Sequence, residues 1–148
     1  MPLPNDWREF IESLNSHRVE YVIVGALALA HHGAPRYTGD LDIFVRSSPG
    51  NAERLESALQ QFGLGALGLS ASDFLVANRV IQLGVPPLRI DLLTSLTGVT
   101  FDEAWVGRIE TKIEGLPLNF IGREELIRNK RAADRPRDRA DLHALGAE

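Results

Sequence analysis

The chain has 148 residues and a net charge of −4, and 44% of its residues are hydrophobic and 24% charged. This composition excludes disorder, collagen and coiled coil, and the length predicts one domain over residues 1–148. The negative charge argues against coating of nucleic acid by bulk attraction, and the lack of cysteine excludes disulfides, thiolate nucleophiles and cysteine-ligated metals.

No segment has the pattern of a membrane span or a signal peptide. The longest uncharged apolar stretch, residues 21–30, is far shorter than the roughly 20 residues that cross a bilayer. The first six residues contain no basic side chain of the kind that opens a signal peptide. We therefore expect a cytoplasmic protein with no membrane partner.

In the first half of the chain, helical patterns alternate with short apolar strands. Apolar side chains recur at helical spacing from Trp7 to Leu14, behind a cap at Asn5 or Asp6. The further elements predicted here are a strand over 20–24, a helix over 26–32, a strand over 41–45 and a helix over 51–61.

The glycines between Gly63 and Gly68 match a dinucleotide-binding fingerprint. That motif needs a strand before the glycines and a long helix after them, so that pyrophosphate meets a helix N-terminus. Here a helical pattern precedes the glycines and a serine-rich stretch follows. We interpret them as a helix stop that leads into a flexible loop.

The second half contains two hairpin patterns and ends in two helices. The predicted elements are strands over 80–83 and 88–93 joined by a proline-containing turn, a helix over 101–106, strands over 108–113 and 116–121 around Glu114 and Gly115, and helices over 124–133 and 137–145 with Pro136 between them. Hairpin strands with helices outside them indicate an α+β, mixed-sheet fold.

Three acids occur in the predicted strands. Asp40 and Asp42 are two residues apart, so their side chains project from one face, and Asp91 lies in another apolar strand where an isolated charge would be unfavourable. Carboxylates gathered in this way form a hard-oxygen site suited to Mg²⁺. Turn capping and edge protection are commoner roles for acids at strand ends, so these remain the alternative.

Gly25 lies where a predicted strand meets a predicted helix. A glycine there lets phosphate oxygens approach the first free N–H groups of the helix, and a side chain in its place would project toward the phosphates. A triphosphate cradle beside a carboxylate metal site is the equipment of nucleotidyl transfer.

An ordered set of motifs carries a family resemblance over residues 20–145. The segments are YVIVGA at 21–26, HG at 32–33, RYTGDLD at 36–42 and RIDLLT at 89–94, followed by Lys130 and an Asp-x-x-Asp-Leu motif at 138–142. They resemble the polymerase-β-type nucleotidyltransferase superfamily, and within it the small bacterial proteins related to abortive-infection (type IV) toxin nucleotidyltransferases.

The resemblance implies a minimal nucleotidyltransferase fold, a mixed sheet flanked by helices with two C-terminal helices. It implies transfer of a nucleoside monophosphate from an NTP, with Mg²⁺ or Mn²⁺, to an RNA such as tRNA or to a protein, and a possible cognate toxin or antitoxin partner. The residues implied are Asp40, Asp42 and Asp91 as metal ligands, the same three with Lys130 as catalytic residues, and Gly25, Ala26, Arg36, Thr38, Lys130 and Asp138 as nucleotide-binding residues.

The sequence departs from the family pattern at Ala26, where Gly-Gly or Gly-Ser is usual at positions 25–26. Backbone N–H groups survive this change, but a serine hydroxyl that could contact phosphate is missing. The alternative function is therefore a catalytically weak or inactive, nucleotide-binding or antitoxin-like protein with the same fold. Neither the NTP nor the acceptor can be read from the sequence.

The C-terminal segment is locally basic, with seven basic and four acidic residues over 123–139. This is either a solvated helix face or an anion-binding surface. If the segment folds over the sheet, as the resemblance implies, Lys130 would meet the triphosphate, Asp138 would orient it or the acceptor, and loss of Lys130 would leave stability nearly unchanged. Salt bridges of Arg135 and Arg137 with Asp138 and Asp141 are the alternative.

Three of the histidines are weaker candidates. His31 and His32 are adjacent on a predicted helix and point in different directions, so we expect helix-end or supporting roles and not joint zinc binding. His143 has no evident partner in the sequence, and we expect it at the surface.

Overall fold

The computed structural model describes residues 3–35, 39–84 and 88–147. Within these ranges the elements are α1 (Asn5–Ser16), β1 (Tyr21–Val24), α2 (Gly25–His31), β2 (Asp40–Val45), α3 (Pro49–Phe62), the 3₁₀ helices η1 (Gly65–Leu67) and η2 (Ala71–Leu75), β3 (Val80–Leu83), β4 (Arg89–Leu93), α4 (Phe101–Val106), β5 (Ile109–Ile113), β6 (Leu116–Phe120), α5 (Arg123–Ala133) and α6 (Pro136–Ala144). No helix among them combines the length and apolar character needed to cross a bilayer.

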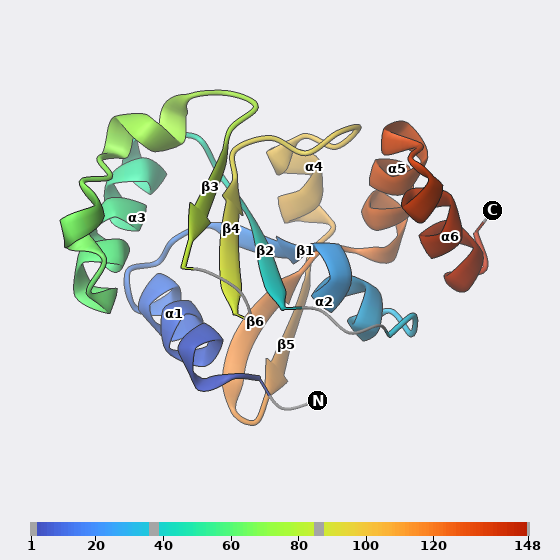
Figure 1. Cartoon of the computed structure of the whole chain (residues 1–148), viewed down its shortest axis with the longest axis horizontal. Helices are drawn as coiled ribbons and strands as arrows, with labels where there is room; N and C mark the ends of the chain where they lie inside the picture. The colour runs from blue at the N-terminus through green and yellow to red at the C-terminus, as the bar shows by residue number, and fades with distance from the viewer. Residues whose placement is uncertain (1–2, 36–38, 85–87, 148) are drawn as a thin grey trace.

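The strands form one six-stranded sheet in the order β3-β4-β2-β1-β6-β5 (Figure 1). The sheet is mixed, because β4 runs parallel to β2 and β6 parallel to β1, whereas β1 and β2 are antiparallel. The hairpins β3–β4 and β5–β6 add an antiparallel strand at each edge. The predicted α+β mixed-sheet fold is confirmed.

The two faces of strand β2 carry different side chains over residues 40–43, apolar on one and acidic on the other, and the acidic face carries the candidate site. In β2, Leu41 and Ile43 are fully buried while Asp40 and Asp42 are only half-buried. Successive strand residues point to opposite faces, so the leucine and isoleucine face the core and the acids face the other way. Figure 1 shows α1 and α3 to one side of the sheet and the α5–α6 pair to the other.

Three local predictions need correction. Neither Asn5 nor Asp6 caps α1: Pro4 is its N-cap, and the Pro4 carbonyl accepts a hydrogen bond from the Arg8 N–H. Pro136 does not separate the last helices but is the first residue of α6, where its missing N–H is not needed.

Gly63 does end α3, with a left-handed φ of 98°, but the segment after it is not a featureless loop. It forms η1 and η2, and η2 is fixed by a capping box between Ser70 and Asp73 and by the fully buried Phe74.

One buried polar side chain links the residue before β1 to the residue after β2. Asn51 is fully buried; its Oδ1 accepts from the Glu20 N–H at 2.7 Å, and its Nδ2 donates to the carbonyls of Glu20 and Arg46 at 3.1 and 2.9 Å. Because Asn51 belongs to the first turn of α3, these bonds tie that helix to both strands.

Candidate active site

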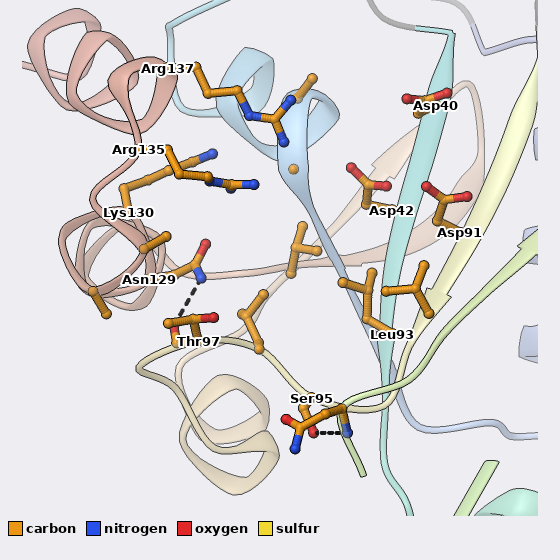
Figure 2. A pocket seen from close by; sticks show the side chains of 18 of the residues that line it. Asp40, Asp42, Asp91, Leu93, Ser95, Thr97, Asn129, Lys130, Arg135 and Arg137 are labelled. Atoms are coloured by element: carbon orange, nitrogen blue, oxygen red, sulfur yellow. Dashed lines mark hydrogen bonds between the residues drawn. The ribbon is translucent and has the colours of Figure 1, made fainter. Parts of the chain in front are cut away.

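A cavity of about 960 Å³ lies over the face of the sheet that carries the acids. Figure 2 shows Asp40, Asp42 and Asp91 on one side of it and Lys130, Arg135 and Arg137 on the other. The sequence-predicted site residues that line it are Gly25, Ala26, Asp40, Asp42, Asp91 and Lys130; Asn78, Arg79, Arg89, Thr97, Asn129, Arg135 and Arg137 line it as well.

The strand register brings the acids together. Asp42 of β2 and Asp91 of β4 are direct partners in the parallel pair, and Asp40 is the partner of Arg89. Positions 40 and 42 share one face of β2, and positions 89 and 91 share the same face of β4. The structure therefore places the three acids on one face of the sheet, as the sequence predicts.

Burial, together with the crowding of these carboxylates, raises the pKa of Asp42 to about 6. Burial is the largest cause, followed by the negative charges of Asp91 and Asp40, while Arg89 acts in the opposite direction. Because the folded-state pKa is raised, ionisation of Asp42 destabilises the fold as the pH rises from about 4 through 6. A cation added at this point would relieve that repulsion.

Arg89 places a positive charge beside the three acids, a role that the sequence analysis did not identify. Its Nη2 lies 3.2 Å from Asp40 Oδ2 and its Nε 3.1 Å from Asp91 Oδ1. The signal was present in the sequence, because Arg89 is two residues before Asp91 in a strand and must share its face.

The carboxylates of Asp40, Asp42 and Asp91 are of the type that binds a divalent cation, although they do not converge on one point in this structure. Among the residues that the structure describes, no group of three His, Asp or Glu side chains is arranged to hold a metal ion. The Asp91 side chain is 10% exposed, and its Oδ1 is buried without a hydrogen bond despite its closeness to Arg89. Oxygen ligands of this kind are those that Mg²⁺ prefers.

Gly25 leaves space beside the β1–α2 turn for the Asp42 carboxylate. Its φ is +70°, and a Cβ built on it would lie within 2.1 Å of Asp42 Oδ2. A side chain here would therefore first meet the Asp42 carboxylate, and its projection toward phosphates stays a prediction. Ala26 is buried and lines the cavity beside it.

Lys130 is buried within the C-terminal helix pair. Its side chain is 6% exposed, and its Nζ lies 3.3 Å from Asp138 Oδ1 and 3.0 Å from Asp141 Oδ2. Arg135 closes the cluster, because its Nε donates to Asp138 Oδ2 at 2.6 Å. Of the two salt bridges considered for the tail arginines, that of Arg135 with Asp138 is present, whereas Arg137 makes no ion pair within the described part of the chain.

Asp138 remains ionised in this buried cluster. Burial alone would raise its pKa, but the hydrogen bonds from Arg135 and the charge of Lys130 together lower it to about 2. The ammonium of Lys130 is thus paired with two buried carboxylates. We therefore expect its removal to lower the stability of the fold, in contrast to the expectation from the sequence.

The other predicted residues have simple placements. Arg36 and Thr38 lie outside the described residues. His31 stacks on Phe120 with ring centroids 4.3 Å apart, and His32 Nε2 lies 2.7 Å from the Ile121 carbonyl oxygen. These contacts hold the end of α2 against the last residue of β6 and the residue after it. His143 is exposed.

Gly25→Ala should lower the unfolding free energy and displace the Asp42 carboxylate, because strained backbone and steric overlap act together. Gly63→Ala is the matched control: it has φ +98° but nothing within 4 Å of its Cβ, so it carries the backbone strain alone. Urea denaturation of both should show a larger loss for Gly25→Ala, by at least about 1 kcal/mol. Equal losses would show that Asp42 does not depend on this glycine.

Lys130→Ala should lower the unfolding free energy by about 3–5 kcal/mol, because Asp138 and Asp141 are left buried without their cation. Lys112→Ala on the exposed side of β5 is the control and should change it by less than about 0.5 kcal/mol. Denaturant titration checks both. If Lys130→Ala is as stable as the control, Lys130 does not stabilise the fold, and contact with substrate remains as its role.

No protein-family model matches the chain, and neither does any curated protein. Among solved structures, the chain is similar to a crystal structure from Thermotoga maritima described as a "putative nucleotidyltransferase". The two share 15% identity with a TM-score of 0.60, over 94% of this chain and 89% of the other. A likeness at this identity bears on the fold, and the chain accordingly has a nucleotidyltransferase-like fold.

Proposed function

We propose that this protein is a nucleotidyltransferase that uses Mg²⁺ or Mn²⁺ to transfer a nucleoside monophosphate from an NTP to an RNA, such as tRNA, or to a protein. The observation that carries the proposal is the charge separation across one cavity. Register-paired Asp42 and Asp91 form one wall and the cations of α5 and α6 form the other. The nucleotidyltransferase-like fold supports it.

Each wall suits one part of such a substrate. Asp40, Asp42 and Asp91 would hold the divalent cation, which when bound lowers the pKa of an attacking hydroxyl and neutralises the leaving pyrophosphate. Arg135 and Arg137 face the acids across the cavity, where they can bind phosphate oxygens. Gly25 keeps the backbone of the β1–α2 turn close to the same point.

Lys130 and Asp138 act differently in this proposal from what the sequence resemblance implied. Their mutual ion pair fixes the fork of Arg135 at the cavity wall, so both residues position a phosphate-binding arginine. Lys130 lines the cavity, but Asp138 and Asp141 already engage its ammonium, which has three N–H donors.

A second candidate is a nucleotide-binding protein of low or no activity, with an antitoxin-like role. The engagement of Lys130 by two buried aspartates and the alanine at position 26 favour it. A place in a toxin–antitoxin or phage-defence system, with a cognate partner in the cytoplasm, follows only from the sequence resemblance and belongs to either candidate.

Asp42→Asn should raise the melting temperature of the metal-free protein at pH 7.5, because it removes a carboxylate whose ionisation is unfavourable. The same change should abolish the rise in melting temperature that Mg²⁺ with NTP causes in the wild type, and abolish nucleotide transfer. Thermal shift, and incubation with each labelled NTP beside tRNA and total protein, measure the two effects.

A wild-type protein without metal-dependent stabilisation at millimolar NTP would contradict the metal site. Stabilisation without transfer to any acceptor would favour the second candidate.

Arg137→Gln should weaken NTP binding by at least about tenfold, or 1.4 kcal/mol, because a cation that lines the cavity is lost. Arg139→Gln is the control on the same helix: Arg139 is ion-paired with Asp134 at 2.8 Å and is not among the cavity-lining residues. Isothermal titration with Mg²⁺–NTP gives both affinities. If both changes weaken binding equally, the effect is one of general charge.

A further inference from the structure

The guanidinium of Arg89 lies among the acids at the place where a cation is needed. Nη2 is 3.2 Å from Asp40 Oδ2 and 3.2 Å from Asp91 Oδ2, and Nε is 3.1 Å from Asp91 Oδ1. The arginine side chain is 27% exposed, so it is partly screened from water. One planar cation therefore joins carboxylates from two neighbouring strands.

This pairing explains why the acids do not form a ready-made metal site. Asp40 and Asp91 both pair with Arg89, while Asp42 lies beside Asp91 in the strand register. In the described residues no three acidic or histidine side chains converge as metal ligands. The positive charge that balances the cluster belongs to the protein itself.

Resting on the proposed function, we propose that Arg89 is a positioning residue that takes the cation's place among Asp40, Asp42 and Asp91 in the metal-free protein and is displaced when a divalent cation binds. Arg89 thereby sets the metal affinity of the site. Without metal it pairs with Asp40 and Asp91 next to Asp42, and it lowers metal affinity because metal and guanidinium compete for the same oxygens.

The backbone at Arg89 favours movement of the side chain alone. Its N–H donates to the Gly39 carbonyl at 2.8 Å, and its strand position is fixed opposite Asp40. The displaced guanidinium would remain within the cavity that Arg89 already lines. There it becomes a free cation beside the metal, suited to an anionic substrate group.

Other cations of the cavity are not equivalent to Arg89. Arg79 lines the same cavity but pairs with Asp73 at 3.2 Å, outside the acid cluster. Lys130 and Arg135 are held by Asp138 on the opposite wall. Arg79 is therefore a matched control that changes the net charge of the cavity without touching the three acids.

The test is titration with Mn²⁺ alone, followed by electron paramagnetic resonance of the free ion and by isothermal titration, for wild type, Arg89→Gln, Arg89→Lys and Arg79→Gln. We expect Arg89→Gln to bind Mn²⁺ about tenfold more tightly than wild type, with a lower melting temperature in the absence of metal. Arg89→Lys should fall between them, because one ammonium cannot bridge both carboxylates as the fork does. Arg79→Gln should match wild type.

Unchanged or weaker Mn²⁺ binding by Arg89→Gln, with binding intact in wild type, would overturn this inference and leave the proposed function standing. Equal gains in Arg79→Gln would assign the effect to net charge and overturn it as well. Absence of Mn²⁺ binding in every variant would overturn the inference together with the metal site of the proposed function. If Arg89→Gln does not fold, the affinity of Arg89→Lys relative to wild type decides in the same way.

Discussion

Two carboxylates held at the same register on neighbouring parallel strands are the constraint around which this structure is arranged. Asp42 and Asp91 are fixed by the β2–β4 ladder and cannot separate without breaking it. Burial and the mutual repulsion of these carboxylates raise the pKa of Asp42. A fold stabilised by only about 5–15 kcal/mol keeps such an arrangement when something else compensates for it.

The compensation comes from neighbouring parts of the chain. Arg89 pairs with two of the acids, and the glycine at position 25 leaves room for the Asp42 carboxylate where any side chain would collide. On the far wall, the buried Lys130 cluster holds α6 against α5 and fixes Arg135 at the cavity. The local strain and charge therefore gather around one cavity, which is typical of a functional site.

Much of the fold follows from local patterns in the sequence. Alternation predicts which face of β2 carries Asp40 and Asp42, and Glu114-Gly115 predicts the β5–β6 turn, in which both residues have positive φ. The β3–β4 hairpin is also confirmed by its pairing, although its connecting residues 85–87 lie outside the described part. These features depend on neighbours in the sequence, so a pattern can reveal them.

The features that sequence reasoning missed depend on contacts between distant segments. Asn51 joins Glu20, 31 positions away in the sequence, to Arg46, and the pattern of its own helix does not predict that role. Phe74 is buried although its surroundings look like a polar loop. The burial of Lys130 depends on how α5 and α6 pack against each other. A run of basic residues in the sequence does not show whether one of its lysines is buried or exposed.

The most direct test of the central claim is a crystal structure of the protein with Mn²⁺ and a non-hydrolysable NTP analogue, with the metal located by anomalous scattering. The account predicts an anomalous peak within coordination distance of both Asp42 and Asp91, with the triphosphate between that peak and Arg137. A peak away from these two carboxylates, or a nucleotide bound elsewhere on the molecule, would contradict it.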